Sequence, residues 1–229
     1  MLKTLDNVLL SEDVVKNFHD SYKNLEFKNW LINILPEIED CKNTEQDNPW
    51  HVYNCLDHIL HSVEEINKQT KQFEYGIRRM LAYTMLLHDI GKPECKIRRY
   101  SKLYKREVDS FFDHNRASVK IGERVLNELG FNQEEKDVVL KLVKNHDVFM
   151  SLTLEPTANQ YKQMLTKDNL HLLIEHLDED KGVILMRYLL MVGNADNMAQ
   201  NPEMTEQSLK LIGVMEDMLY EVYGRELQN

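Results

Sequence analysis

The feature of the sequence that most constrains the fold is a set of histidines and aspartates that lie far apart along the chain but are suited to bind the same ions. The set consists of His58, the adjacent pair His88-Asp89, His114, His146 and Asp196. Five of the six residues lie in segments whose pattern predicts a helix or a helix end, so a helical bundle could bring them to one point. Four imidazoles and two carboxylates are enough ligands for two divalent cations. The set therefore predicts metal-assisted chemistry.

Hydrophobic residues recur at helical spacing along most of the chain. The pattern predicts helices within residues 1–40 (ending at Leu35-Pro36), 52–68, 73–88, 111–129, 132–145, 160–179, 182–199 and 204–224. Between them lie a polar loop at 41–49, an irregular basic stretch at 91–109 and a looser region at 151–159. No segment shows sustained strand alternation, and there are only 8 glycines and 5 prolines. We therefore expect an all-α fold: one domain over 1–229, with an N-terminal helical segment (1–45), a core (46–205) and a C-terminal helix (206–229).

Charge and cysteine content limit the partners and the compartment. The formal net charge of −10 argues against extended nucleic-acid binding through phosphate contacts, although a local basic patch for a small phosphorylated substrate is compatible with it. Cys41, Cys55 and Cys95 are odd in number and form no C-x-x-C pair, which favours a reducing compartment. The first residues acquire charges too early for a secretory signal, and no apolar run approaches the ~18 to 20 residues that span a membrane. We expect a cytoplasmic protein without a membrane partner.

The pair His88-Asp89 is the strongest single signal for a metal. The apolar residues before it would bury the pair, and an unpaired buried carboxylate is costly, so a cation would be stabilising. In the alternative interpretation, Asp89 caps the next turn and His88 only fills space. The residues that follow, Ile90-Gly91-Lys92-Pro93, end the helix and place Lys92 beside the pair.

The other candidate ligands carry weaker signals. His58 competes with His51, because the two share a helix face but lie about 10 Å apart along its axis, and we favour His58. Taken singly, His114, His146 and Asp196 are typical of surface or capping residues, and their joint occurrence with the His-Asp pair favours ligation. Imidazole-rich ligation suits Mn, Fe, Ni, Co or Zn better than Mg. We expect one or two divalent metal ions (Mn, Fe, Ni, Co, Zn or Mg), with Asp147 orienting the adjacent imidazole.

These stretches resemble the HD superfamily of metal-dependent phosphohydrolases and, more narrowly, the HD region of bacterial CCA-adding tRNA nucleotidyltransferases. The matching stretches stand in the order of that family and together cover roughly residues 25–205. They are ILPEIEDC (34–41), QDNPWHVYNCLDHIL (46–60), LLHDIGKPECK (86–96), FFDHNRAS (111–118), LVKNHD (142–147) and ADNMAQNPE (195–203). The ordered series is more specific than HD-I-G-K alone.

The resemblance implies an HD-domain helical bundle with particular ligands. A first metal would be held by His58, His88, Asp89 and Asp196. Asp89 would bridge to a second metal held by His114 and His146 in members that bind two. His51 would face the substrate rather than the metal.

The chain departs from the family pattern in two places. Asp113 stands before His114 where relatives often have glycine, which weakens the expectation of a close substrate approach at that edge. The stretch before residue 25 is too short for a nucleotidyltransferase head, and no glycine-serine motif with paired catalytic aspartates occurs. CCA addition is therefore not expected.

The favoured hypothesis is hydrolysis of a phosphate mono- or diester, in particular of a nucleotide, by metal-activated water. Asp89 and Lys92 would be catalytic, and His51, Lys92, Arg98 and Arg99 would contact the substrate. The basic segment 92–106 either reaches over a polyanion or is simply solvated. Two alternatives stay open: a diiron oxygenase of the same superfamily, and a non-catalytic nucleotide- or RNA-binding module. The flanks that resemble tRNA nucleotidyltransferases argue against the first, and the intact ligand set argues against the second.

Overall fold

The structure is a computed structural model, and it describes residues 1–157 and 159–228. Ala158, in the predicted looser region, and Asn229 lie outside the described residues. The longer helices are α1 (Leu2–Leu9), α2 (Val14–Tyr22), α3 (Leu25–Ile34), α5 (Cys55–Gln69), α6 (Tyr75–Leu87), α8 (His114–Glu128), α9 (Gln133–Asn145), α10 (Lys167–Leu177), α11 (Gly182–Met198) and α12 (Pro202–Tyr223). The shorter ones are α4 (Glu37–Lys42), α7 (Lys92–Cys95), η1 (Val148–Ser151) and η2 (Glu226–Gln228). The predicted all-α class is confirmed.

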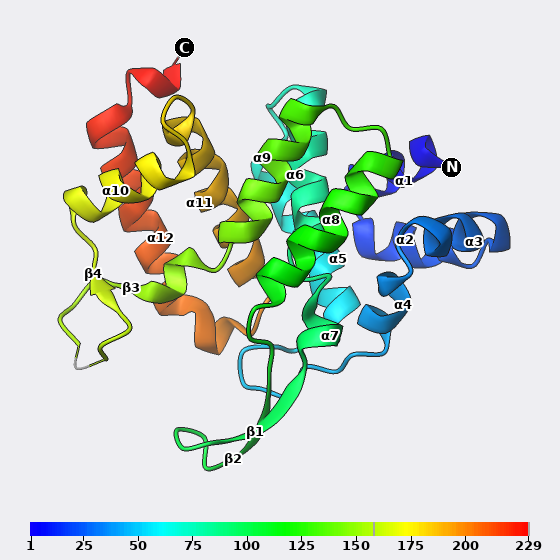
Figure 1. Ribbon diagram of the computed structural model, residues 1–229, viewed down its shortest axis with the longest axis horizontal. Coiled ribbons are helices and arrows are strands. Elements are labelled where there is room, and N and C mark those ends of the chain that lie inside the picture. Colours follow the sequence, from blue (N-terminus) through cyan, green and yellow to red (C-terminus); the bar gives the residue numbers. More distant parts are fainter. Residues whose placement is uncertain (158, 229) are drawn as a thin grey trace.

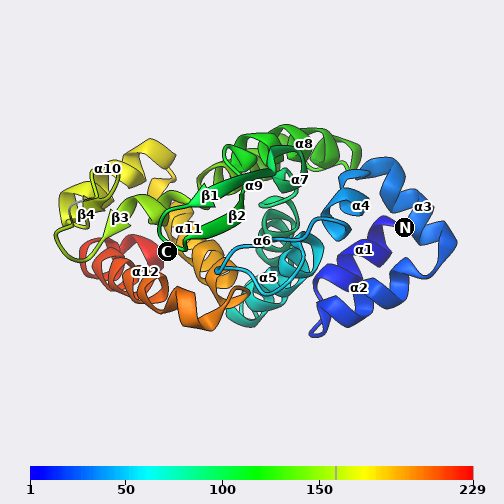
Figure 2. The ribbon, with the colours of Figure 1, turned by 90° about the horizontal axis from the view of Figure 1, so that it is seen from below.

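The helices follow one another along the length of the molecule (Figures 1 and 2). Helices α1–α4 form one end, α5, α6, α8 and α9 the middle, and α10–α12 the other end. A hydrophobic cluster of buried side chains runs from Leu5 in α1 to Leu219 in α12. Its centre is α6, whose residues from Leu81 to Leu87 are all buried, in agreement with the apolar run in the sequence.

Helix α11 joins the middle of the molecule to its C-terminal end. It packs against α5, α9 and α12, and it also contacts α6 and α10. Its buried face extends from Gly182 to Asp196, so the carboxylate near its C-terminal end reaches the same region as the N-terminal end of α5. Among the described residues, the helices lack the combination of length and apolar character that crossing a membrane requires.

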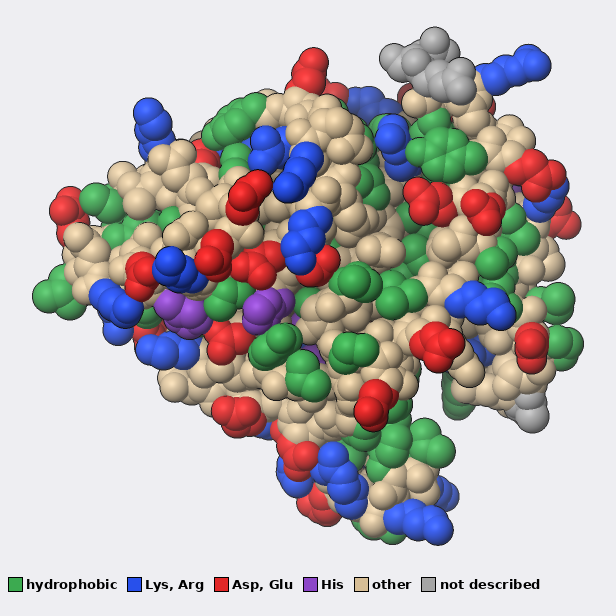
Figure 3. Space-filling model, turned by 180° about the vertical axis from the view of Figure 1, so that it is seen from behind, with side chains coloured by type: hydrophobic (Ala, Val, Ile, Leu, Met, Phe, Trp, Pro, Cys, Tyr) green, Lys and Arg blue, Asp and Glu red, His purple; other side chains and the backbone are tan. Residues whose placement is uncertain are grey.

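One basic segment differs from the prediction. Within the stretch 91–109, strands β1 (Ile97–Ser101) and β2 (Arg106–Ser110) form an antiparallel hairpin in which Ile97 pairs with Ser110. The hairpin projects from the body of the molecule (Figure 1), and lysine and arginine side chains gather on this projection (Figure 3). The expectation of no strand was wrong here because β1 is almost wholly exposed, so its sequence lacks the alternation of a half-buried strand.

The segment before α10 also differs from the prediction. The helix predicted over 160–179 begins only at Lys167, where the Thr166 side chain accepts a hydrogen bond from the Asn169 amide. Before that cap, β4 (Gln163–Met164) pairs in parallel with β3 (Leu152–Thr153). A threonine N-cap therefore sets the start of this helix.

Candidate metal centre

The six candidate ligands are delivered by the ends of five helices. His58 lies in the first turn of α5, where the Asn54 side chain accepts a hydrogen bond from the Asp57 amide and caps the helix. The others are His88 at the C-cap of α6 with Asp89 after it, His114 at the start of α8, His146 at the C-cap of α9, and Asp196 in the last turn of α11. Helix ends that meet in the bundle therefore bring residues far apart in the sequence to one place.

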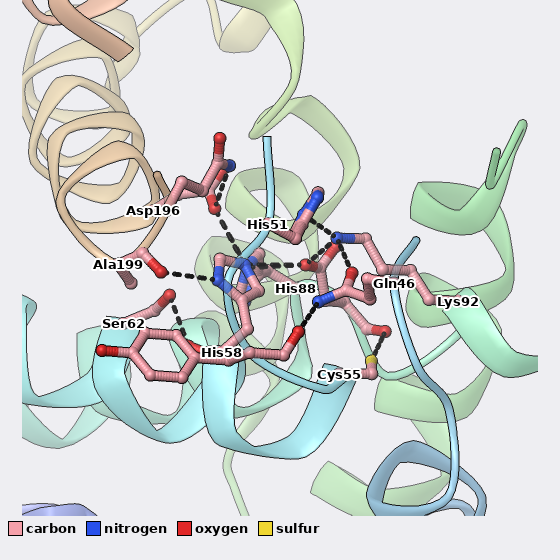
Figure 4. Close-up of polar contacts among 12 residues, drawn as sticks. Gln46, His51, Cys55, His58, Ser62, His88, Lys92, Asp196 and Ala199 are labelled. Atoms are coloured by element: carbon pink, nitrogen blue, oxygen red, sulfur yellow. Dashed lines mark hydrogen bonds and ion pairs between the residues drawn. The ribbon is translucent and has the colours of Figure 1, made fainter. Parts of the chain in front are cut away.

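The first group consists of His58, His88, Asp89 and Asp196, whose ligand atoms all lie within 4.8 Å of one another. His58 Nε2 is 3.0 Å from both Asp89 Oδ2 and Asp196 Oδ1, and His88 Nε2 is 3.2 Å from Asp89 Oδ2. The His58, His88 and Asp196 side chains point toward one another (Figure 4). His51 is not in this group, because its Nε2 instead lies 3.0 Å from the Nζ of Lys92.

The second group consists of Asp89, His114 and His146. Asp89 Oδ1 lies 3.1 Å from His114 Nε2 and 3.7 Å from His146 Nε2, and the two Nε2 atoms are 3.1 Å apart. The two groups therefore share Asp89, which turns Oδ2 to the first and Oδ1 to the second. This is the arrangement of a carboxylate that bridges two ions.

All four histidines are oriented in the same way. Each Nδ1 lies against a main-chain carbonyl oxygen: Ala199 for His58 (3.3 Å), Met85 for His88 (2.7 Å), Phe111 for His114 (2.8 Å) and Val143 for His146 (2.7 Å). Because a carbonyl oxygen only accepts, each Nδ1 must be the donor. In the neutral rings, Nε2 then offers its lone pair to the cluster, which is the form in which histidine binds a metal.

The polar atoms of the cluster fit a bound cation. His58 Nε2, His88 Nε2 and Asp89 Oδ1 are buried and make no hydrogen bond with any described residue, although charged neighbours lie close to them. Buried polar atoms without partners are destabilising, and a divalent ion would satisfy all three. The side chains therefore suit one or two divalent metal ions.

The pKa values of the clustered side chains also fit a site for divalent cations. Burial alone would lower the pKa of His58, but the nearby Asp196 and Asp89 carboxylates raise this pKa to about 9. For His88 burial again opposes, and the charge of Asp89 raises the pKa to about 9. Burial would raise the pKa of Asp89, yet the charges of His88 and Lys92 hold it well below its usual value. Without metal, imidazole protons therefore balance the carboxylates, and divalent ions would replace these protons.

Lys92 lies beside the cluster with three acceptors around its ammonium group. It is 5 % exposed, and its Nζ is 2.5 Å from Asp89 Oδ2, 2.9 Å from Gln46 Oε1 and 3.0 Å from His51 Nε2. His51 Nδ1 in turn lies 2.9 Å from Asn48 Oδ1, so the imidazole offers Nε2 to the lysine. Sequence reasoning did not find Gln46, whose only signal was its place in the stretch QDNPWH.

The two predicted substrate-binding arginines on the hairpin face acidic or aromatic neighbours. Arg98 lies 2.6 Å from an Asp47 oxygen and 3.1 Å from an Asp109 oxygen, and Arg99 stacks over Phe112 at 4.9 Å. None of their contacts with described residues joins them to the metal groups. Strand pairing explains this, because it sets Arg98 directly opposite Asp109.

The hairpin instead clamps the loop that carries Gln46 and His51. The Asp109 amide donates to the Asp47 carbonyl, and the Asp47 amide donates to Asp109 Oδ2, each at 2.9 Å. The Asp109 side chain is 2 % exposed and also lies 3.0 Å from the Nζ of Lys96. This buried carboxylate thus fixes the loop that contacts Lys92.

Asp147 contacts the adjacent imidazole through Nε2 and not through Nδ1. Its carboxylate lies 3.3 Å from His146 Nε2 and 3.4 Å from His114 Nε2, on the side where a metal would sit. The ring of His146 is oriented by the Val143 carbonyl instead. At 34 % exposure, the Asp147 side chain borders the second group on the solvent side.

Two backbone features bring α8 close to the His-Asp pair. A Cβ atom on Gly91 would lie only 2.6 Å from the Ser118 amide and 2.7 Å from the His114 carbonyl, so only glycine permits this approach. Asp113 has a φ of 60°, in the left-handed region that favours glycine and tolerates aspartate. This conformation explains why the residue type at this position matters for the entry into α8.

Comparison with known protein families accounts for this arrangement. The HD domain model matches residues 51–181, which include five of the six candidate ligands; Asp196 lies beyond the match and is brought in by the fold. No curated protein is significantly similar to the chain. Proteins with this domain are in general metal-dependent phosphohydrolases. Since the match covers more than half of its length, the chain belongs to the HD domain family.

Proposed function

We propose that the protein hydrolyses a phosphate mono- or diester, with metal-activated water as the nucleophile. The observation that carries this proposal is the convergence of four imidazole Nε2 atoms on two carboxylates, with Asp89 shared between two groups. Family membership supports the same class of reaction.

In this proposal the two groups have distinct ligands. A first divalent ion would be held by His58, His88, Asp89 and Asp196, and a second by Asp89, His114 and His146. Such ions, when bound, polarise phosphoryl oxygens and lower the pKa of a bound water toward neutrality. The imidazole content favours Mn, Fe, Ni, Co or Zn over Mg.

Lys92 would bind and stabilise the phosphoryl group. Its ammonium is buried beside the shared carboxylate, where a positive charge stabilises developing negative charge much more strongly than in water. All three of its hydrogens face protein acceptors, so a substrate oxygen would replace one of them, and His51 is the neutral acceptor nearest the solvent side. His51 would then turn toward the substrate.

We also propose a small phosphorylated substrate, in particular a nucleotide, and a cytoplasmic protein that acts as one domain. The likeness to the HD region of CCA-adding enzymes supports the nucleotide, and the net charge of −10 disfavours long nucleic acids. The continuous core from α1 to α12 supports a single domain comprising segment 1–45, core 46–205 and C-terminal helix 206–229.

A diiron oxygenase is the second candidate, because a carboxylate shared between two imidazole-rich groups also suits a pair of iron ions. The two functions differ in what they consume. Protein loaded with iron under anaerobic conditions should release phosphate or alcohol from an ester without dioxygen if it is a hydrolase. Dependence of turnover on dioxygen would favour the oxygenase.

The direct test is to load the protein with each divalent ion and assay it against nucleotides, cyclic nucleotides and dinucleotide polyphosphates. His58→Ala should lose the ion of the first group and turnover together. His61→Ala, on the same helix and outside both groups, is the matched control and should keep both. Stoichiometric metal without turnover of any phosphate ester or any oxygenase reaction would instead support a binding module.

A further inference from the structure

A second polar pocket lies away from the metal centre, between the α1–α2 connection and the facing sides of α5 and α6. Its volume is about 480 Å³, within the roughly 300–1,000 Å³ typical of small-molecule sites. It is lined by Leu10, Ser11, Glu12, Glu64, Asn67, Lys68, Lys71 and Arg78. Asn67 and His58 occupy opposite ends of α5, roughly 13 Å apart along its axis. The pocket is therefore separate from the two metal groups.

The inner wall carries a hydrogen-bond acceptor without a partner. Asn67 is 5 % exposed, and its Nδ2 donates to the carbonyls of Leu9 (2.7 Å) and Ser11 (3.1 Å). These two bonds fix which end of the amide is which. Asn67 Oδ1 is buried and makes no hydrogen bond with the described residues. Asn67 is one of the lining residues, so its buried amide oxygen is an acceptor at the pocket wall that has no donor in the described part of the chain.

The same wall carries a cation without a counter-ion. Arg78 Nε is buried without a hydrogen-bond partner, and its guanidinium makes no ion pair with the described residues. The next residue provides a contrast, since Arg79 lies 3.1 Å from an Asp6 oxygen and stacks on Phe131 at 3.9 Å. In a chain with 38 acidic residues, a half-buried arginine with no carboxylate indicates a place for an external anion.

The remaining charges of the pocket are already paired. The two oxygens of Glu64 accept from the Val15 amide (3.0 Å) and lie near His61 Nδ1 (3.3 Å). Lys68 pairs with Glu65, and Lys71 pairs with Glu12 at the exposed rim. The groups left for a ligand are therefore one buried acceptor and one guanidinium.

We propose that this pocket binds a small anion that carries a hydrogen-bond donor next to its anionic group. The Arg78 guanidinium would bind the carboxylate or phosphate, and an adjacent hydroxyl or amino group would donate to Asn67 Oδ1. Hydroxycarboxylates and phosphorylated polyols share this chemistry. Water alone would satisfy the amide oxygen but would leave the arginine without a counter-charge. The proposal is independent of the reaction at the metal centre.

The test uses the full chain and two-dimensional NMR, because the metal centre also attracts anions and only a residue-resolved signal separates the two sites. Glycerol 3-phosphate and glycerate are the two-function probes for phosphate and carboxylate, and inorganic phosphate and glycerol are the single-function probes. We expect chemical-shift changes at the Asn67 side-chain amide and the Ser11 backbone that saturate with a millimolar Kd for the two-function probes. The single-function probes should bind about tenfold more weakly. Whichever of glycerol 3-phosphate and glycerate binds more tightly shows whether the site prefers a phosphate or a carboxylate.

Variants then assign the binding to the named side chains. Arg78→Gln should weaken the two-function probes about tenfold, whereas Lys68→Gln, which removes a rim cation already paired with Glu65, should change binding less than about twofold. Absence of saturable shifts at Asn67 with every probe would overturn the proposal. Equal binding of inorganic phosphate and glycerol 3-phosphate, or unchanged binding to Arg78→Gln, would overturn it as well.

Discussion

The two metal groups share one carboxylate but differ in their access to solvent. In the first group the His58 and His88 side chains are at most 1 % exposed, and Asp196 is 12 % exposed. In the second, His146 is 1 % exposed and His114 is 12 % exposed, but this group also borders the Asp147 side chain, which is 34 % exposed. The first group offers four ligands and the second only three, and the half-exposed Asp147 beside the second gives water and other ligands a route to it. We therefore expect the first site to hold its ion more tightly and the second to admit the substrate.

Asp89→Ala should have the largest effect, because it removes the only residue shared by both groups. We expect loss of both ions and a fall in kcat of about a thousandfold or more. Elemental analysis and a phosphatase assay measure the two effects. Asp57→Ala is the control, because this aspartate precedes His58 in α5 but pairs with His19 outside the cluster. Retention of one tightly bound ion in Asp89→Ala would show that the two groups are independent.

His58→Ala and His114→Ala separate the two groups directly. We expect His58→Ala to lose the tightly bound ion, and His114→Ala to keep that ion while losing the weaker one and about a hundredfold in kcat/KM. Metal titration by calorimetry resolves the two sites. An equal loss of both ions in the two variants would contradict the difference in ligand number and solvent access as the cause.

Lys92→Ala tests the group that lies beside both sites. We expect a fall in kcat of about a hundredfold with little change in metal content, because the ammonium stabilises the transition state and is not itself a ligand. Steady-state kinetics at saturating metal measure it. A variant with the full rate would remove Lys92 from the mechanism.

The pH dependence of the metal-free protein tests the protonated histidines of the cluster. The pKa values of His58 and His88 are raised from 6.5 to about 9 by folding. Their stabilising contribution is therefore fully present below about pH 6.5 and lost as the pH rises through about 9. With a chelator, we expect Tm to fall by about 5 °C or more across this range. The metal-loaded protein, in which ions replace the protons, should change less, and equal slopes with and without metal would count against this explanation.

Asp109→Asn should have the smallest effect, because it acts through the loop that carries Gln46 and His51. We expect faster hydrogen exchange in residues 44–54, unchanged metal content and a fall in kcat/KM of about tenfold. Glu107→Gln, whose carboxylate only approaches Arg98 at 3.8 Å on the surface, is the control. Unchanged exchange in this loop would show that the hairpin does not position it.

A structural feature could be predicted from the sequence where neighbouring residues in the chain determine it. The helix predicted over 73–88 is α6 within a few residues, because an apolar run and the stop at Ile90-Gly91 are local signals. The six histidines and aspartates also come together as expected, because each lies at a helix end in the bundle.

The parts that could not be predicted depend on tertiary neighbours. The β1–β2 hairpin is held by cross-strand pairs and by Asp47, far away in the sequence, so its exposed basic residues gave no strand pattern. For the same reason Arg98 was expected to face a substrate and instead faces Asp47 and Asp109. Gln46, Asn67 and Arg78 have ordinary sequence surroundings. Only the fold shows that Gln46 contacts Lys92 and that Asn67 Oδ1 and Arg78 Nε have no hydrogen-bond partner among the described residues.

The most direct test of a shared two-metal centre is anomalous X-ray diffraction from crystals grown with Mn²⁺. We expect two peaks, one on each side of the Asp89 carboxylate: the first among His58, His88 and Asp196, and the second between His114 and His146. A protein that shows no anomalous peak within bonding distance of Asp89, at saturating Mn²⁺, Fe²⁺ and Zn²⁺ alike, would contradict it.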